Sequence, residues 1–432
     1  MAIDTAAKRQ AALRNRRGML RPDGDLTSGA DRAAMLGHYW FPFPPPGPDI
    51  IPPTDAEIAD ALSGRHGPVA MRFRFEQRTL WNEFVQDLDA AVILNVGEII
   101  VDNTRAVVWT CDLRVRPQLL PATFDPDTDH FAIFAEAFAG QYLGTGEWVP
   151  FQLGLYSMDE VRATPSANNQ EAWDVRAADV SLLLFEKYTQ VSYTVAAGAR
   201  FTDTVYALIT GLGLRAQITD SGLTLPVART WPSNTPYGTI VNALLKAINY
   251  HPAFADNEGI VTSTPRLAPS TETADVAYTT EAEPRMIRPG FQRLRNRNLY
   301  PNRVTVVNRD ANRAPFAVEG INDDPDSLVS TVVKGSVTSI EVDGSLVPST
   351  AVAAAVASYE LQAAAGEAER GTLSTHPDPR RGPRDFYEIT FEGAEVATLW
   401  RSLGWRLALR TGTKMDHQIA RASQVDVTTT TV

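Results

Sequence analysis

The chain has 432 residues, of which 44% are apolar and 21% charged, and its formal net charge is −11. This length predicts about two to four packed units of a globular protein rather than one domain. The negative charge argues against broad binding to nucleic acid, whose affinity comes mainly from neutralised phosphates. Neither a membrane-spanning run of roughly 20 apolar residues nor the apolar core of a secretory signal is visible.

The N-terminal residues 1–40 are predicted to form two short helices that stand apart from the main body as an arm. A Pro-rich stretch, residues 41–65, follows and predicts an extended spacer. The arm is either a disordered tail or a segment that orders on a neighbouring protein. We favour the second alternative because five large apolar side chains would be costly to leave in water: Met35, Leu36, Tyr39, Trp40 and Phe41.

In residues 66–180 the apolar side chains recur with a period of two. Val69, Met71, Phe73 and Phe75 alternate with more polar neighbours, which is typical of a half-buried strand. Further strands are predicted over residues 91–101, 106–116, 148–156 and 172–175. We therefore expect a first β-barrel domain over residues 66–180.

Cys111 is the only cysteine, so it forms no disulfide within the chain. It stands in the strand pattern at the same parity as Trp109, Leu113 and Val115. This position predicts a small buried hydrophobic residue rather than a nucleophile.

In residues 181–300 the apolar side chains recur at helical spacing instead. The apolar residues between 201 and 212 predict one helix, which ends at Gly211 and Gly213. Thr235-Pro236 is a favourable start for a second helix, and a turn at residues 256–259 predicts a small hairpin. This region is expected to be an α+β middle domain.

Strands are predicted again after residue 300, over residues 303–308, 387–391 and 403–409. An Ala-rich helix with Val352, Val356 and Tyr359 on one face lies between them. Residues 301–432 are therefore expected to form a second β-barrel with an inserted helix. The predicted fold class is α+β and β-rich, with two tube-like β-barrel domains, an α+β middle region and a helical N-terminal arm.

Motifs that carry chemistry are weak. Residues 211–216 have the letters of a dinucleotide fingerprint, but their glycines end a helix instead of joining a strand to a new helix. Asp125, Asp127, Asp129 and Glu136 have calcium-loop spacing, yet His130 stands where the turn needs glycine. A solvated acidic loop is favoured there over a calcium site outside a helix–loop–helix.

No zinc-hydrolase motif, nucleophile elbow or Walker loop occurs, and the six histidines lie far apart in the sequence. We therefore expect no catalytic residue, no metal and no cofactor.

A basic cluster lies in the stretch from residue 285 to residue 309, which contains no acidic residue. The first interpretation is a linker that is solvated or paired within the chain. The second is an inter-subunit surface, because guanidinium groups bind carboxylates well, and the third is a surface facing passing DNA in a lumen. The cluster consists of Arg285, Arg288, Arg293, Arg295, Arg297 and Arg303.

The order of several segments resembles the tail-hub family of bacteriophages, which includes baseplate hubs and the N-terminal part of tail-associated minor tail proteins. These segments are residues 94–115 with RAVVWTCDLRV, 147–156 (EWVPFQLGLY), 173–181 (WDVRAADVS), 193–198 (YTVAAG) and 300–306 (YPNRVTV). The resemblance covers about residues 66–430. Residues 1–40 are similar to short segments of actinobacterial phage structural proteins. Unlike some relatives, the sequence has no C-terminal peptidase, lysozyme-like or fibre domain.

The resemblance implies a structural protein that closes the tail tube at the tip of the virion after assembly in the host cytoplasm. It implies a homotrimer whose chains each supply two tube-like barrels, so that six barrels match a sixfold tube. The implied partners are further copies of the chain, the distal tail or tube protein, the tape-measure protein and fibre or tip-plug proteins. The implied role includes gating of DNA passage, without specific nucleic-acid binding and without enzymatic activity; a long non-contractile tail is favoured.

Two rival functions stay open at this point. A receptor- or carbohydrate-binding tail protein would gather exposed aromatic side chains in a groove, for which Trp148, Trp173, Trp231 and Trp405 are candidates. A tail-associated cell-wall hydrolase is the enzymatic alternative.

Overall fold

The fold is seen in a computed structural model that describes residues 54–63, 69–141, 145–165, 171–268, 272–279, 286–297, 299–390, 397–423 and 425–431. The arm expected over residues 1–40 lies outside these residues. None of the helices in the described part is long and apolar enough to cross a membrane.

The expected extended spacer over residues 41–65 contains a helix instead, α3 (Asp55–Ser63). Its start is a capping box, in which Thr54 and Glu57 exchange hydrogen bonds. The Thr54 backbone N–H donates to Glu57 Oε2 at 2.7 Å, and the Glu57 N–H donates to Thr54 Oγ1 at 3.2 Å. Leu62, at the end of this helix, is buried in the main core, so the helix belongs to the body of the protein.

The N-terminal strands form the first lobe, in which all neighbouring strands are antiparallel. One buried apolar cluster, to which most of these strands contribute, forms its core. The strands are β1 (Met71–Arg78), β2 (Phe84–Leu88), β3 (Ile93–Asp102), β4 (Trp109–Val115), β5 (His130–Gln141), β6 (Thr145–Pro165) and β7 (Glu171–Asp179).

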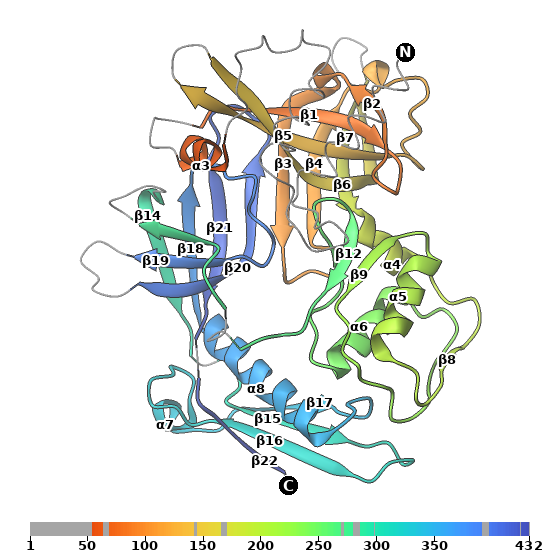
Figure 1. The fold of residues 1–432 in the computed structure, drawn as a ribbon, viewed down its shortest axis with the longest axis vertical. Helices are drawn as coiled ribbons and strands as arrows, with labels where there is room; N and C mark the ends of the chain where they lie inside the picture. Colours follow the sequence, from red (N-terminus) through yellow and green to blue (C-terminus); the bar gives the residue numbers. More distant parts are fainter. Residues whose placement is uncertain are drawn as a thin grey trace.

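A second lobe has its own core, which includes Tyr278, Tyr387 and Trp400. Its strands are β13 (Val276–Thr279), β14 (Met286–Arg295), β18 (Glu369–Thr375), β19 (Phe386–Thr390), β20 (Thr398–Ala408) and β21 (Met415–Arg421). The two lobes belong to one 13-stranded sheet, in the order β14-β18-β21-β20-β3-β4-β7-β6-β5-β1-β2, with β19 and β13 branching from β20 (Figure 1).

The middle unit, residues 183–263, packs against the outer face of β5 and β6. Its two principal helices are α5 (Phe201–Gly211) and α6 (Tyr237–Ala247), as the apolar stripes predict. Thr235 does not cap α6, because its hydroxyl donates to Pro232 O at 2.7 Å and Pro236 takes the N-cap position. The remaining elements are α4 (Leu183–Glu186), β8 (Tyr193–Val195), β9 (Arg215–Ile218), β10 (Arg229–Trp231), β11 (Phe254–Ala255) and β12 (Ile260–Ser263).

A separate four-stranded unit lies at the C-terminal end of the molecule (Figure 1). Its sheet has the order β17-β15-β16-β22, and α8 (Thr350–Glu367) covers one face with a core that includes Val304, Val306 and Leu361. The other elements are β15 (Arg303–Asn308), β16 (Phe316–Asn322), α7 (Thr331–Lys334), β17 (Ser339–Asp343) and β22 (Val427–Thr431).

The strands after residue 300 thus divide between two sheets, which differs from the single unit expected over residues 301–432. Most of the four-stranded unit, from β15 to α8, is inserted between β14 and β18, and these two strands pair with each other directly. Its last strand, β22, follows β21 instead. β14 lies before residue 300, so strand pairing crosses the expected boundary. The prediction of a β-rich α+β fold is confirmed.

Candidate assembly surface

The two lobes meet at a seam in which β3 and β20 pair in antiparallel fashion. The register runs from Gly404 opposite Asp102 to Ala408 opposite Glu98. Backbone hydrogen bonds extend it at both ends, from Asn103 N to Leu403 O at 2.8 Å and from Leu409 N to Gly97 O at 2.8 Å. Continuous main-chain bonding therefore joins one lobe to the other.

Glycine at position 404 permits the close approach of these strands. A Cβ atom at this position would lie 2.1 Å from the Val101 carbonyl oxygen, far inside van der Waals contact. The clash would be with main chain, which cannot move aside like a flexible side chain. β20 also contains an irregularity between Ser402 and Gly404 relative to β21, which turns the strand at the point where it leaves the second lobe's core.

Beneath the seam, aromatic packing links the lobes. The rings of Trp109 and Trp405 meet edge to face with centroids 5.4 Å apart, and both side chains are buried. Leu407 of β20 and Leu409, just after the strand, also lie in the core of the first lobe. Because edge-to-face aromatic pairs add to the effect of burial, the second lobe contributes directly to the stability of the first.

The opposite face of the sheet is polar across the seam. Alternate residues of β3, β4, β7, β18, β20 and β21 point away from the cores, and a hollow of about 340 Å³ lies over the seam. Ion pairs lie on this face: Arg406 lies 3.9 Å from Glu98, and Lys414 lies 2.9 Å from Asp416. A face with balanced charge offers little attraction to a polyanion.

Asp179 fixes the point where β7 leaves the sheet for the middle unit. Its carboxylate accepts hydrogen bonds from Trp109 N at 2.9 Å and from Ser181 N at 2.7 Å. Complete burial raises the pKa of this carboxyl group from 3.8 to about 6, despite these hydrogen bonds. Asp179 thereby connects β4, the neighbour of the seam strand β3, with the start of the middle unit.

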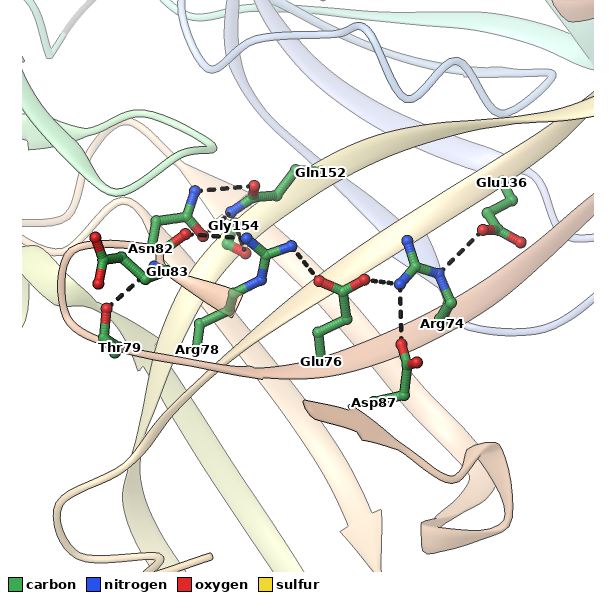
Figure 2. A network of polar contacts seen from close by, with 10 residues as sticks. All are labelled: Arg74, Glu76, Arg78, Thr79, Asn82, Glu83, Asp87, Glu136, Gln152 and Gly154. Atoms are coloured by element: carbon green, nitrogen blue, oxygen red, sulfur yellow. Dashed lines mark hydrogen bonds and ion pairs between the residues drawn. The ribbon is translucent and has the colours of Figure 1, made fainter. Parts of the chain in front are cut away.

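A buried ionic network on β1 joins this strand to β2 and β5 of the first lobe (Figure 2). Glu76, with no exposed surface, binds both Arg74 and Arg78. Arg74 Nε also donates to Glu136 Oε1 at 3.0 Å, and Arg78 Nη1 donates to Asn82 O at 2.9 Å. The alternation in β1 predicted a solvated face here, whereas Glu76 and Arg78 on that face are buried.

The network continues into the middle unit through amide groups. Asn82 and Gln152 exchange side-chain hydrogen bonds of 3.1 and 3.2 Å, as Figure 2 shows. Asn257, in the turn between β11 and β12, donates to the Gln152 main-chain oxygen at 3.1 Å. The Asn257 hydrogen bond links the middle unit to the first lobe. Within the ionic network, removing one partner of Glu76 would leave a buried charge without compensation.

The predicted basic cluster is divided by the fold. Arg293 and Arg295 lie on β14 next to the buried Glu369, with Arg295 Nε 3.7 Å from its carboxylate. Arg303 lies on β15, with its Nε 3.5 Å from Glu319. Arg297 is exposed after the end of β14, whereas Arg285 and the side chain of Arg288 lie outside the described part of the chain.

The predicted docking residues of the arm, Met35, Leu36, Tyr39, Trp40 and Phe41, also lie outside the described residues. Sequence reasoning did not single out Glu369, which also binds Arg421 at 3.1 Å. Its position 74 residues beyond Arg295 gave no local signal.

The glycine motif at residues 211–216 and the acidic residues with calcium-loop spacing have structural roles. Gly211 ends α5 and β9 begins at Arg215, so the glycine motif joins a helix to a strand, in the sense opposite to a dinucleotide site. Asp129 Oδ2 accepts from Asp125 N at 2.9 Å and from Gln77 Nε2 at 2.6 Å. Glu136 instead lies within β5 and binds Arg72 at 2.6 Å, so the acidic residues do not converge.

The buried histidine of the second lobe is structural. His417 Nε2 lies 2.9 Å from Thr375 Oγ1, and its ring packs against Tyr387. Burial, followed by the charge of Arg381, lowers the pKa of His417 to about 3. Cys111 is fully buried, as predicted, and burial raises the pKa of its thiol.

The four candidate tryptophans do not form a groove. Trp405 and Trp231 are buried, in the first lobe's core and the middle unit's core respectively. Trp148 is half-buried beneath Arg72, whose guanidinium carbon lies 4.5 Å from the ring centroid. Trp173 is half-buried on β7.

No known protein family matches the sequence, and no curated protein matches it significantly. The fold itself is that of bacteriophage tail proteins. The tail protein from Neisseria meningitidis MC58 has a TM-score of 0.56 at 11% identity, over 81% of this chain and 97% of that chain. The 43 kDa tail protein of prophage MuSo2 from Shewanella oneidensis has a TM-score of 0.53 at 10% identity, over 83% of this chain and 100% of that chain.

These likenesses confirm the predicted resemblance to phage tail proteins at the level of the fold. The actinobacterial origin stays a prediction.

Proposed function

We propose that the protein is a structural subunit of a phage tail, acting as the hub that closes the tail tube at its tip. The observation that carries this proposal is the shared fold, which extends over more than four-fifths of this chain and nearly all of two phage tail proteins. A similarity that extends over whole chains favours a common structural role, because it is not confined to a single domain found in otherwise unrelated proteins.

The arrangement of the two lobes supports a trimeric hub. Each chain contains two strand-rich lobes joined side by side through β3 and β20. Three copies around a threefold axis would present six lobes, which can match the symmetry of a sixfold tube. In this arrangement the partners are other copies of the chain, the distal tail or tube protein above, and fibre or tip-plug proteins below.

The polar sheet face supports a position beside the path of DNA. Its ion pairs, Arg406 with Glu98 and Lys414 with Asp416, would line a lumen without holding phosphates strongly. The face would surround the end of the tape-measure protein before ejection and admit DNA afterwards. We propose no catalytic step, and a cleared zone in a peptidoglycan zymogram of the purified protein would contradict this part.

The direct test is a three-dimensional reconstruction of the tail of the particle that encodes this chain, with a Fab fragment bound to the middle unit as a marker. We expect three Fab fragments around the tip, below the last sixfold ring. Labelling of the capsid or along the tube, or no labelling, would reject the proposed location. The purified protein should also have three times the chain mass of 47.2 kDa in mass photometry.

A further inference from the structure

The four-stranded unit has two outer strands whose far edges pair with no strand among the described residues. β17 pairs only with β15, and β22 pairs only with β16. Both strands are five residues long. Their edges therefore present two rows of backbone hydrogen-bonding groups of equal length.

Neither edge carries lysine or proline, two residues that often prevent strands from pairing between molecules. β17 has the sequence Ser-Ile-Glu-Val-Asp and β22 has Val-Thr-Thr-Thr-Thr, without lysine or proline. Four of the five residues of β22 are exposed threonines, which favour strand structure. Ile340, in β17, is 40% exposed. These edges are suited to strand addition.

Exposed apolar side chains also lie in the segment that precedes β17. Val332 is 62% exposed and Val337 is 54% exposed. Loop hydrogen bonds hold this region in place, because Asn302 Nδ2 donates to Ser336 O at 2.8 Å and Thr338 N donates to Asn302 Oδ1 at 2.8 Å. An ordered apolar surface therefore adjoins the β17 edge and would be covered by a neighbour.

Resting on the proposed trimer, we infer that β17 of one copy pairs in parallel with β22 of the adjacent copy. Within one chain β17 is parallel to β15, while β16 is antiparallel to both β15 and β22. β17 and β22 consequently run in the same direction at opposite edges of the sheet. Rotation about an axis along the strands brings β22 of one copy beside β17 of the next with both directions preserved.

Symmetry selects this pairing over the alternatives. Contacts between identical edges, β17 with β17 or β22 with β22, require a twofold axis and produce dimers. A ring of three copies needs a head-to-tail contact between two different surfaces. Pairing β17 with β22 supplies such a contact and uses both edges of every copy.

The charges at the two edges are compatible with this contact. β22 carries no charged side chain. The acidic Glu341 of β17 lies 2.7 Å from Arg309 of its own chain, and Asp343 accepts a hydrogen bond from Ser345 N at 2.9 Å. No like charges would face each other across the contact.

A cross-linking experiment tests this contact. The double variant Ile340→Cys/Thr429→Cys is treated with a bismaleimide shorter than the intrachain separation of the two edges, which is about 14 Å for three strand spacings. Cys111 is fully buried, so it serves as an unreactive internal control. We expect covalently linked pairs and trios of chains on a denaturing gel.

The single variants identify which edges meet. Ile340→Cys alone and Thr429→Cys alone should give no cross-link, whereas their co-assembled mixture should give linked pairs. Linkage within either single variant would show contact between identical edges and overturn the inference. A trimeric mass without cross-linking of the double variant would overturn the contact while leaving the proposed hub intact. A monomeric mass without cross-linking would reject both.

A second variant measures the contribution of the edge to assembly. Ile340→Lys places a charge on the free edge, and because the side chain is partly exposed the fold should persist. We expect the trimer peak to be replaced by monomer in size-exclusion chromatography with an unchanged circular dichroism spectrum. Val191→Lys, at a 73% exposed position of the middle unit, is the matched control and should remain trimeric. An unchanged trimer in Ile340→Lys would overturn the inference.

Discussion

Asp179 is a buried acid whose protonation is coupled to folding. Burial raises the pKa of its carboxyl group from 3.8 to about 6, so the folded state binds this proton more tightly than the unfolded state. The favourable contribution of that proton is complete below about pH 4 and is lost as the pH rises through 6. Over this interval the free energy of unfolding should decrease by about 3 kcal/mol through this group.

Asp179→Asn should remove this pH dependence, because an amide does not titrate. We expect the difference in unfolding free energy between the natural protein and the variant to shift by about 3 kcal/mol between pH 4 and pH 7, in favour of the variant at the higher pH. Urea unfolding at both pH values measures this difference. Asp174→Asn, at an exposed position on the same strand, provides the matched control. A difference that does not change with pH would contradict the prediction.

The seam between β3 and β20 depends on one glycine. Gly404→Ala would force a Cβ atom toward the Val101 carbonyl oxygen, and the strands would have to separate. We expect a loss of about 1–3 kcal/mol in the free energy of unfolding, at the upper end because the clash is with main chain. Denaturant titration checks this value. Gly211→Ala, where no atom lies within 4 Å, should be neutral or slightly stabilising, and equal losses in both variants would contradict the prediction.

Elements with a clear local period could be predicted from the sequence. The strand expected over residues 303–308 is β15 with the same bounds, and the helix expected between residues 201 and 212 is α5. In both elements one face is buried and the other is not, so the apolar residues alternate with the period of the element. The local pattern of apolar residues was therefore sufficient to predict these two elements.

β5 could not be predicted in this way because it is buried on both faces. Ile133 and Ala135 belong to the first lobe's core, while Ala132 and Phe134 belong to the core shared with the middle unit. The strand therefore shows a continuous apolar run without alternation, which does not distinguish a strand from a buried helix. Glu76, on the neighbouring strand β1, is also buried, although the alternation had assigned it to solvent.

The candidate surface depends on contacts between distant parts of the chain. β3 and β20 are separated by about 300 residues, and neither sequence specifies the other as a partner. The arginines at 293 and 295 were identifiable as a cluster, but their partner Glu369 lies beyond β15, β16, β17 and α8 in the sequence. The sequence identified the arginines and the strands, but only the tertiary fold shows which residues and strands pair with each other.

The molecule as a whole is unified by side chains that belong to one lobe and are buried in the other. Trp405, Leu407 and Met415 come from strands of the second lobe and lie in the core of the first. The four-stranded unit differs, because α8 and the inner face of its sheet form a separate core around Leu361. The two lobes should therefore unfold together, as a single cooperative unit.

Hydrogen exchange of the variant Trp405→Ala tests this coupling. Removing a fully buried tryptophan should reduce the opening free energy by about 3–5 kcal/mol. Because its ring packs on Trp109 across the seam, peptides from β4 should lose protection together with peptides from β21. In Leu361→Ala the loss should concentrate in β15 and β16, whose core that residue fills. If Trp405→Ala reduces protection only in the second lobe, the lobes fold independently, and the seam would be a docking contact between two domains rather than the centre of one.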